Sequence, residues 1–152
     1  MKKLTLTVAS VLLLGVALAQ DYTPPAKAIT ALSAKYANAT VQEWYEGFEG
    51  AECSFENNGL YGIAYFSQSG NWMYSEYTIE ESELPKAVAE MLAEDFVGYE
   101  IFDITMTENP KKIKYAISIF NEEADDNRIV TYDETGDLID EMVITMDDDS
   151  SE

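Results

Sequence analysis

The sequence of 152 residues contains no histidine. Histidine is the commonest general base and a frequent metal ligand, so its absence removes the standard Ser-His-Asp and Cys-His catalytic arrangements and most metallohydrolase sites. The chain also has no glycine-rich phosphate loop, no Cys-x-x-Cys pair and no nucleophile elbow. We therefore expect a protein that is not an enzyme and that carries no cofactor.

Cysteine is almost absent, since Cys53 is the only one. A single thiol cannot form an intramolecular disulfide, even in an oxidising compartment. No Lys or Arg stands near Cys53 in the sequence to activate the thiol. The position therefore favours a small buried strand residue over a reactive cysteine.

Basic residues are scarce, with nine Lys and Arg against 29 Asp and Glu. Two of the nine precede an apolar run over residues 4–18, which closes on Ala17-Leu18-Ala19. This is the pattern of a secretory signal peptide with a small-x-small cleavage site. The run is short for a bilayer span and is followed at once by Asp21. We expect residues 1–19 to be removed on export, leaving a periplasmic or secreted protein with no membrane insertion.

The predicted mature chain carries seven basic and 29 acidic residues, a formal net charge of −22. Such a charge keeps a protein soluble and argues against nucleic acid and anionic membranes as partners. Cations and basic protein surfaces remain open as partners, beside a generic solubilising role for the acids. The acidic run at residues 147–152 is interpreted as a tail.

Two helices and eight strands are predicted from the spacing of apolar residues. Each helix follows a proline and has an apolar stripe at helical spacing, the first from about residue 25 and the second from about residue 85. Period-two runs separated by Gly, Asn, Asp and Ser predict antiparallel strands. The strand-like runs are Val41–Phe48, Ala51–Phe55, Leu60–Phe66, Trp72–Ile79, Tyr99–Met106, Ile113–Phe120, Arg128–Tyr132 and Leu138–Met146.

The second half of this pattern repeats the first. Pro25 matches Pro85 at a shift of 60 residues, and Gly70 matches Gly136 at a shift of 66. Chance resemblance between two alternating patterns is the alternative, but it does not predict matching proline and glycine positions.

From this we predict one α+β domain over residues 20–146, made of two tandem helix-plus-antiparallel-meander units at about 23–80 and 84–146. The helices are expected to pack on one face of the sheet and to leave the other face exposed, because two short helices cannot cover both faces of so many strands.

Aromatic residues occur at both parities of the predicted strands, so the exposed face is also expected to carry some. Tyrosine and tryptophan dominate binding hot spots because they are large and amphipathic. We take Trp44, Tyr61, Trp72 and Tyr74 as the candidate binding residues on the exposed sheet face, and strict alternation over residues 72–79 places Trp72 and Tyr74 on the same face. Cross-strand aromatic pairing that only stabilises the sheet is the alternative interpretation.

Several short motifs together resemble the PepSY-like, beta-lactamase-inhibitor-protein-like (BLIP-like) family of exported bacterial proteins over nearly all of residues 25–146. The motifs are Trp44, Phe66-x-x-x-Gly70-x-Trp72, Leu84-Pro85-x-x-Val88, Gly98-Tyr99-x-Ile101, Tyr115-x-Ile117 and Tyr132-Asp133-x-x-Gly136. The resemblance implies tandem helix-plus-sheet units and a periplasmic or secreted location.

Inhibitor proteins of this fold act through a hairpin loop and an aromatic sheet surface, and PepSY relatives are associated with restraining peptidases. The resemblance therefore implies a non-catalytic binding module, inhibitor-like toward a protein partner such as a peptidase or other hydrolase. The corresponding hairpin would lie near residues 56–59, where the inhibitor's contact residues have no match.

A small-ligand or calcium-binding periplasmic protein is the alternative function. Carboxylate oxygens suit calcium, and Asp133, Glu134, Asp137 and Asp140 surround one turn. These acids lack the spacing, the glycine and the closing Glu of an EF-hand loop. We therefore predict no metal-binding residues and interpret the acids as solvated turn residues.

Overall fold

The computed structural model describes residues 22–144, so the predicted signal peptide (1–19) and acidic tail (147–152) lie outside the described residues. None of the helices in this range is long and apolar enough to cross a membrane. The elements are α1 (Ala26–Lys35), β1 (Thr40–Glu46), β2 (Gly50–Asn57), β3 (Leu60–Ser67), β4 (Trp72–Thr78), the 3₁₀ turn η1 (Glu81–Glu83), α2 (Lys86–Asp95), β5 (Glu100–Glu108), β6 (Ile113–Asn121), β7 (Asp126–Asp133) and β8 (Leu138–Ile144).

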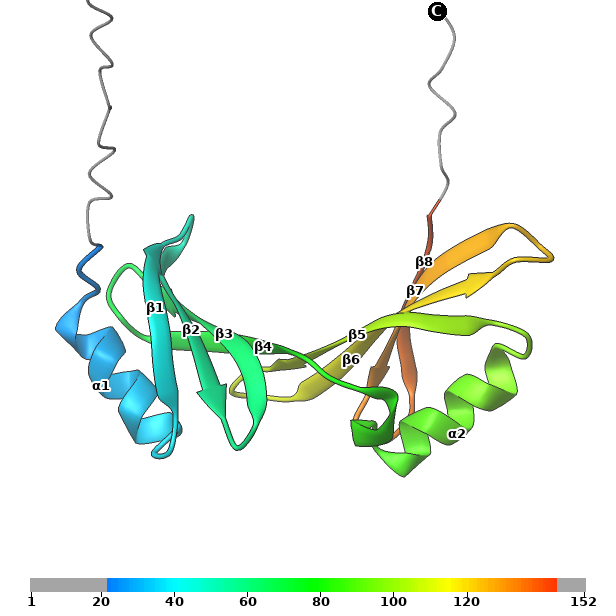
Figure 1. The fold of residues 1–152 in the computed structure, drawn as a ribbon, viewed down its shortest axis with the longest axis horizontal. Coiled ribbons are helices and arrows are strands. Elements are labelled where there is room, and N and C mark those ends of the chain that lie inside the picture. Colours follow the sequence, from blue (N-terminus) through cyan, green and yellow to red (C-terminus); the bar gives the residue numbers. More distant parts are fainter. Residues whose placement is uncertain (1–21, 145–152) are drawn as a thin grey trace, which may run out of the picture.

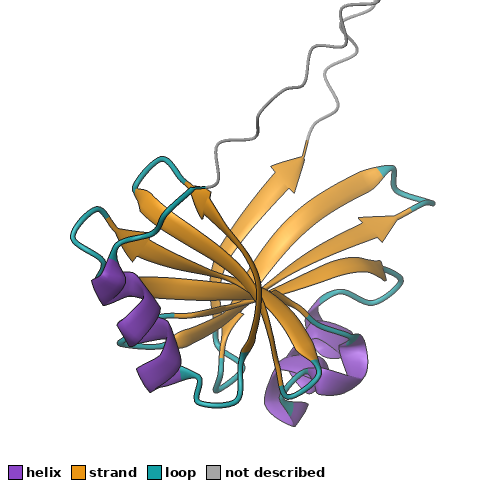
Figure 2. Ribbon diagram, turned by 60° about the vertical axis from the view of Figure 1, so that its left-hand side comes forward, coloured by secondary structure: helices purple, strands orange, loops and turns teal. Residues whose placement is uncertain are grey.

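All eight strands belong to one antiparallel sheet, in which each strand pairs with its neighbours in the sequence (Figure 1). The centre of the sheet is the pairing of β4 with β5, where residues 75–78 run opposite residues 105–108. In Figure 2 the strands cross and fan outward, which shows how strongly the sheet twists. The two helices lie at opposite ends of this sheet (Figure 1).

The prediction of two tandem helix-plus-meander units is wrong. The strands predicted for residues 23–80 and 84–146 form one continuous sheet, because β4 and β5 pair edge to edge. A free strand edge presents unpaired backbone N–H and C=O groups, so joining two such edges satisfies both sets. Sequence alternation locates strands, but it does not say which edges meet.

Turn chemistry explains why the strands reverse where they do. The β2–β3 hairpin turns on Asn58 and Gly59, whose φ angles are 54° and 86°. Two consecutive residues in this left-handed region match the twist of a two-residue hairpin, and Asn-Gly is the pair that adopts it most readily. The predicted positions of the eight strands are confirmed to within a few residues.

Both helices pack on the same face of the sheet, which holds the hydrophobic core. The register links the buried positions across strands: Phe55 lies opposite Gly62, Gly62 opposite Tyr77, and Tyr77 opposite Met106. Fully buried aliphatic side chains such as Ile117 and Val130 each contribute about 1.5–3 kcal/mol through removal from water. From the helices, the core receives Ala28, Leu32, Val88 and Leu92, and Tyr36, the residue that follows α1, is buried with them.

Four of the strands contain a bulge, a point where one extra residue interrupts the pairing. The extra residues are Gln42 in β1, Met73 in β4, Phe102 in β5 and Ile139 in β8. A bulge bends its strand, increases the local twist and reverses the side-chain alternation on one side of it. These bulges contribute to the twist of the sheet and decide which side chains lie on which face.

Candidate functional site

The face of the sheet opposite the helices is the candidate site at the β1–β4 end. Its side chains are tyrosines and carboxylates with a few smaller residues between them, and all are exposed or half-buried. We call this surface the aromatic–acidic face, and its residues are Glu43, Tyr45, Glu52, Ser54, Glu56, Tyr61, Ile63, Tyr65, Tyr74 and Glu76.

Tyr65 and Tyr74 form the centre of this face. They lie opposite each other on β3 and β4, with ring centroids 4.4 Å apart and an angle of 17° between the ring planes. The hydroxyl of Tyr65 donates a hydrogen bond to Oε2 of Glu76 at 3.1 Å. Burial, and after it the charge of Glu76, raises the pKa of both tyrosines above the ordinary value. Both hydroxyls are therefore neutral hydrogen-bond donors at physiological pH.

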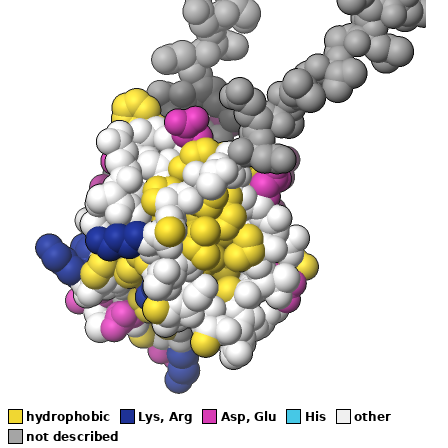
Figure 3. Space-filling model, turned by 90° about the vertical axis from the view of Figure 1, so that its left-hand side faces the viewer, with side chains coloured by type: hydrophobic (Ala, Val, Ile, Leu, Met, Phe, Trp, Pro, Cys, Tyr) yellow, Lys and Arg dark blue, Asp and Glu magenta, His cyan; other side chains and the backbone are white. Residues whose placement is uncertain are grey.

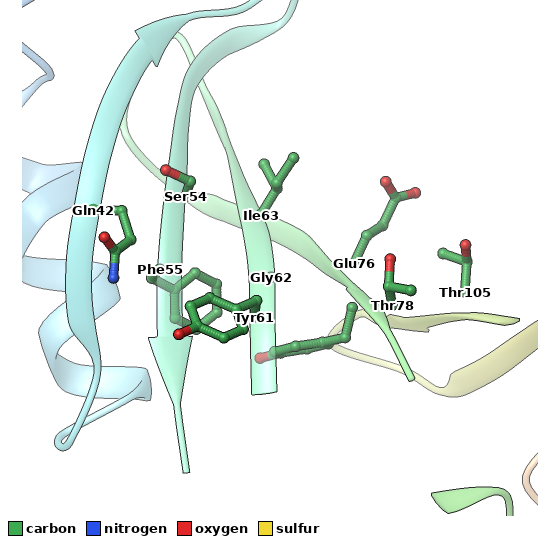
Figure 4. A pocket seen from close by; sticks show the side chains of 10 residues that line it. Gln42, Ser54, Phe55, Tyr61, Gly62, Ile63, Glu76, Thr78 and Thr105 are labelled. Atoms are coloured by element: carbon green, nitrogen blue, oxygen red, sulfur yellow. The ribbon is translucent and has the colours of Figure 1, made fainter. Parts of the chain in front are cut away.

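A hollow of about 350 Å³ opens on this face beside the stacked pair. In Figure 4, Gln42 lies at one side of it and Glu76 and Thr105 at the other, with the Tyr61 ring between them. The Tyr61 side chain is 65% exposed, so its ring is available to a ligand. A cavity of this size with a few convergent polar groups is in the range of ligand pockets.

A second, smaller hollow of about 230 Å³ lies on the other side of the stacked pair and is lined in part by Phe48, Tyr65 and Tyr74. Phe48, in the β1–β2 turn, is almost completely exposed at 99%. Figure 3 looks onto the end of the molecule where α1 and β1 lie, and hydrophobic side chains gather there in a patch beside basic ones. Exposed hydrophobic residues at this end include Ile29, Val41 and Tyr45.

All charged side chains of the aromatic–acidic face are negative. No Lys or Arg occurs between Lys35 and Lys86, a segment that contains all of β1–β4. The ion pairs among residues 22–144 are Lys35–Glu108, Lys86–Glu90, Arg128–Asp126 and Arg128–Glu141. None of these pairs includes a carboxylate of the aromatic–acidic face.

The structure divides the four predicted binding residues between the two faces. Tyr61 and Tyr74 lie on the aromatic–acidic face, whereas Trp44 and Trp72 lie on the helix face. Trp44 packs against Phe66 with ring centroids 5.4 Å apart. The four residues are therefore not brought together, and a binding role for each of them stays a prediction.

Trp72 is part of a polar cluster under the end of α1. Its indole N–H donates to Oγ of the buried Ser75 at 2.9 Å, and Nζ of Lys35 lies 3.8 Å from its ring centroid. Lys35 also pairs with Oε1 of Glu108 at 2.7 Å. The Tyr36 hydroxyl lies 2.9 Å from Oγ of Ser75 and 3.0 Å from Oε2 of Glu108. A phenol has one proton, so at any moment the Tyr36 hydroxyl donates to only one of these two oxygens.

The bulge at Met73 is the reason that Trp72 and Tyr74 face opposite ways. Tyr65 lies opposite Tyr74, and the next residue, Phe66, lies opposite Trp72, so Met73 has no partner. Strict alternation over residues 72–79 would place Trp72 and Tyr74 on one face. The expectation of a shared face is wrong because one extra residue reverses the alternation.

Comparison with known proteins rests on structure, because neither a protein-family model nor a curated protein sequence matches the chain. A BLIP-like protein of Bacteroides fragilis superimposes with a TM-score of 0.71 over 86% of this chain and 94% of its own, at 24% sequence identity. The chain has the BLIP-like fold. A DUF2874 family protein of Bacteroides ovatus follows with a TM-score of 0.70 and 20% identity, over 80% of this chain and 89% of its own.

A third neighbour with the BLIP-like fold, from Bacteroides eggerthii, bears a provisional name as a periplasmic protein. It covers 82% of this chain and 91% of its own, with a TM-score of 0.68 and 19% identity. The resemblance to BLIP-like proteins expected from the sequence is confirmed at the level of the fold. The PepSY part of that resemblance is not tested by these neighbours and stays a prediction.

Sequence reasoning did not select Tyr65, Glu76 and Phe48 as site residues of this BLIP-like sheet. The alternation of Tyr61, Ile63 and Tyr65 along β3 is the signal that could have found one of them, because it places all three on the same face. Glu76 had no distinguishing signal among 29 acids. Phe48 could be read as a strand end, and only its exposure in the β1–β2 turn distinguishes it.

The acidic turn that was considered as a calcium site has an internal structural role. The Asp133 carboxylate accepts hydrogen bonds from the Thr135 hydroxyl at 2.6 Å, from the Thr135 backbone N–H at 2.9 Å and from the Asp137 backbone N–H at 3.1 Å. These bonds, led by the one from the Thr135 side chain, lower the pKa of Asp133. Among residues 22–144, no three acidic or thiol side chains are grouped so that they could hold a metal ion.

Proposed function

We propose that this protein is an exported, non-catalytic binding module that uses its aromatic–acidic face to bind a partner protein, and that it inhibits a peptidase or other hydrolase. The observation that carries the proposal is the exposure of Tyr45, Tyr61 and Ile63, at 42%, 65% and 37%, on a sheet face that neither α1 nor α2 covers. Exposed aromatic side chains gathered on one surface mark sites of protein–protein contact.

Four further observations support the proposal. The lack of histidine disfavours the commonest catalytic arrangements. The apolar run at residues 4–18, outside the described residues, supports export, as does the provisional periplasmic name of the Bacteroides eggerthii neighbour. The BLIP-like name of the Bacteroides fragilis neighbour supports a hydrolase as the partner.

Capture from a periplasmic extract tests this function. Residues 20–152 are immobilised as the wild type, as a Tyr45→Ser/Tyr61→Ser double variant and as a Phe102→Ser control, because Phe102 is 88% exposed but lies outside the aromatic–acidic face. Bound proteins are identified by mass spectrometry, and any hydrolase among them is assayed with increasing amounts of the chain. We expect the wild type and the control to capture and inhibit the same hydrolase, and the double variant to bind it at least tenfold more weakly. Equal capture by all three chains would contradict the proposal.

A small ligand is the second candidate function, and the hollow of about 350 Å³ is the observation that favours it. Calcium is the ion considered with it, because the Glu76 carboxylate lines the hollow and further carboxylates occur in the turns. Titration calorimetry with calcium, before and after treatment with a chelator, tests the ion. Heat of binding together with a rise in melting temperature would favour this function over protein binding.

A further inference from the structure

The protein holds two of its own cations in the same way, between an aromatic ring and carboxylates. Lys35 lies 3.8 Å from the centroid of Trp72 and 2.7 Å from a Glu108 oxygen. The Arg128 guanidinium lies 5.8 Å from the centroid of Tyr99 and pairs with Asp126 at 2.5 Å as well as with Glu141. An aromatic face and a carboxylate together attract a cation by complementary electrostatic terms.

The aromatic–acidic face repeats this combination of groups without a cation from its own strands. Tyr61 and Glu76 line the same hollow, and the stacked Tyr65 and Tyr74 lie beside it. Glu76 has no ion-pair partner among the described residues, whose salt bridges all lie elsewhere. The segment from residue 36 to residue 85 contains no Lys or Arg that could pair with the Glu76 carboxylate.

Lys114 on β6 lies in the same line of residues across the sheet as Glu76, but it does not pair with the Glu76 carboxylate either. In the register, Glu76 lies opposite Thr107, and Thr107 lies opposite Lys114. Two strand spacings separate Lys114 from Glu76, roughly 10 Å. Lys114 also lies directly opposite Asp133 on β7, so a carboxylate stands closer to it in the sheet.

We propose that the hollow at Tyr61 and Glu76 receives a lysine or arginine side chain of the partner protein. The inference rests on the proposed function and names the chemistry of the contact. The stem of the basic side chain lies against Tyr61 and Ile63, and its charged end reaches the Glu76 carboxylate, which Tyr65 holds in place through its hydrogen bond. Ser54, Thr78 and Thr105 also line the hollow and offer hydroxyl groups to the remaining N–H donors.

The test is an NMR titration of isotopically labelled residues 20–152 with capped amino acids. The probes are N-acetyl-lysine and N-acetyl-arginine methylamides, and the uncharged controls are the corresponding norleucine and glutamine compounds. We expect saturable shifts, for the two basic probes only, at the backbone amides of Tyr61, Ile63, Glu76 and Thr105. Glu76→Gln keeps an acceptor for Tyr65 but loses the charge, so the association constant should fall about tenfold.

The matched control is Glu123→Gln, which removes one charge from an exposed turn far along the chain. It should leave the association constant unchanged. The inference would be overturned if Glu123→Gln lowered the association constant as much as Glu76→Gln does. It would also be overturned if the chemical-shift changes spread over all acidic surfaces, or if no localised change occurred. Shifts at the same amides that depend on protein concentration alone would overturn it too, because a second copy of the chain would then supply the cation.

The NMR titration tests the cation site, whereas the capture experiment tests the proposed function, and the two can give different answers. If the captured partner binds the wild type and Glu76→Gln equally well but loses affinity for Tyr45→Ser/Tyr61→Ser, the face is the binding site and the basic side chain is not the contact. If no partner binds the face while the basic probes bind the hollow, the proposed function fails and the cation site remains.

Discussion

The ammonium nitrogen of Lys35 lies 3.8 Å from the centroid of the Trp72 ring and 2.7 Å from Oε1 of Glu108. This one side chain connects the end of α1 with β4 and with the end of β5. The Lys35 and Glu108 side chains are only 25% and 28% exposed, so water screens their attraction less than it would at the surface.

Replacement of Lys35 by methionine should lower the free energy of unfolding by about 1–2 kcal/mol. The change keeps most of the side-chain volume but leaves Glu108 half-buried without its cation. Urea denaturation followed by circular dichroism measures the effect. The control is Lys86→Met, whose pair with Glu90 is exposed at 87% and 64% and should be worth less than about 0.5 kcal/mol. If Lys35→Met and Lys86→Met lowered the free energy of unfolding equally, the Lys35 contacts would stabilise the fold no more than an exposed ion pair does.

Replacement of Ser75 by alanine should cost about 1–3 kcal/mol, because it leaves the Trp72 indole N–H without its acceptor in a half-buried position. The chain has two tryptophans, so a change at Trp72 is visible in the fluorescence. We expect a shifted emission maximum together with a lower urea midpoint. Ser54→Ala on the opposite face is the control and should change neither quantity. An unaltered midpoint in Ser75→Ala would mean that water replaces the hydroxyl without loss.

Replacement of Gly70 by alanine should destabilise the protein by more than about 2 kcal/mol. Gly70 has a φ of 77°, and an added Cβ would lie 2.8 Å from the backbone nitrogen of Ala28 in α1. Gly59→Ala provides the matched comparison, since its φ is 86° but nothing lies within 4 Å of the added carbon. That change should cost only the strain of the left-handed backbone, about 1 kcal/mol. Melting curves of the two variants give the difference, and equal costs would contradict a close approach of α1.

Stability should fall as the pH rises above 10. Burial raises the pKa of Tyr132 to about 12 and also raises the pKa of Tyr36, Tyr65 and Tyr77 from the ordinary value of 10.0. Above pH 10 the unfolded chain loses phenolic protons that the folded chain keeps, so the stabilisation is complete below pH 10 and is lost as the pH rises through the folded-state pKa values.

Absorbance at 295 nm and circular dichroism measure this alkaline transition on the same sample. We expect the buried tyrosines to ionise in one step together with the loss of sheet structure. Ionisation of all ten tyrosines near pH 10 with the sheet intact would contradict the prediction.

The sequence allowed the strands to be placed because turns and alternation are local signals. Asn58-Gly59 specifies a hairpin by its own backbone preference, and the alternation of β2 separates buried Ala51, Cys53 and Phe55 from the residues between them. The burial of Cys53 was predicted because no Lys or Arg stands near it in the sequence to activate a reactive thiol. This burial is confirmed, and it raises the pKa of the Cys53 thiol to about 12.

The parts that failed depend on relations that no local pattern contains. Pairing of Ser75 with Glu108 joins positions 33 residues apart, and two unpaired meanders would show the same alternation as one sheet. The division of Trp72 from Tyr74 depends on the unpaired Met73, which alternation does not reveal. As a result, two of the four residues predicted from the sequence, Tyr61 and Tyr74, lie on the aromatic–acidic face. The other two, Trp44 and Trp72, lie on the helix face.

The β4–β5 junction gives the sheet a mechanical weak point. Four residue pairs join these strands, whereas the other neighbouring strands share five to eight. Bending stress applied to the two ends of the molecule therefore concentrates at this narrow section. The Lys35–Glu108 ion pair and the Tyr36–Glu108 hydrogen bond cross it from α1 to β5, so they act as a brace that resists flexing.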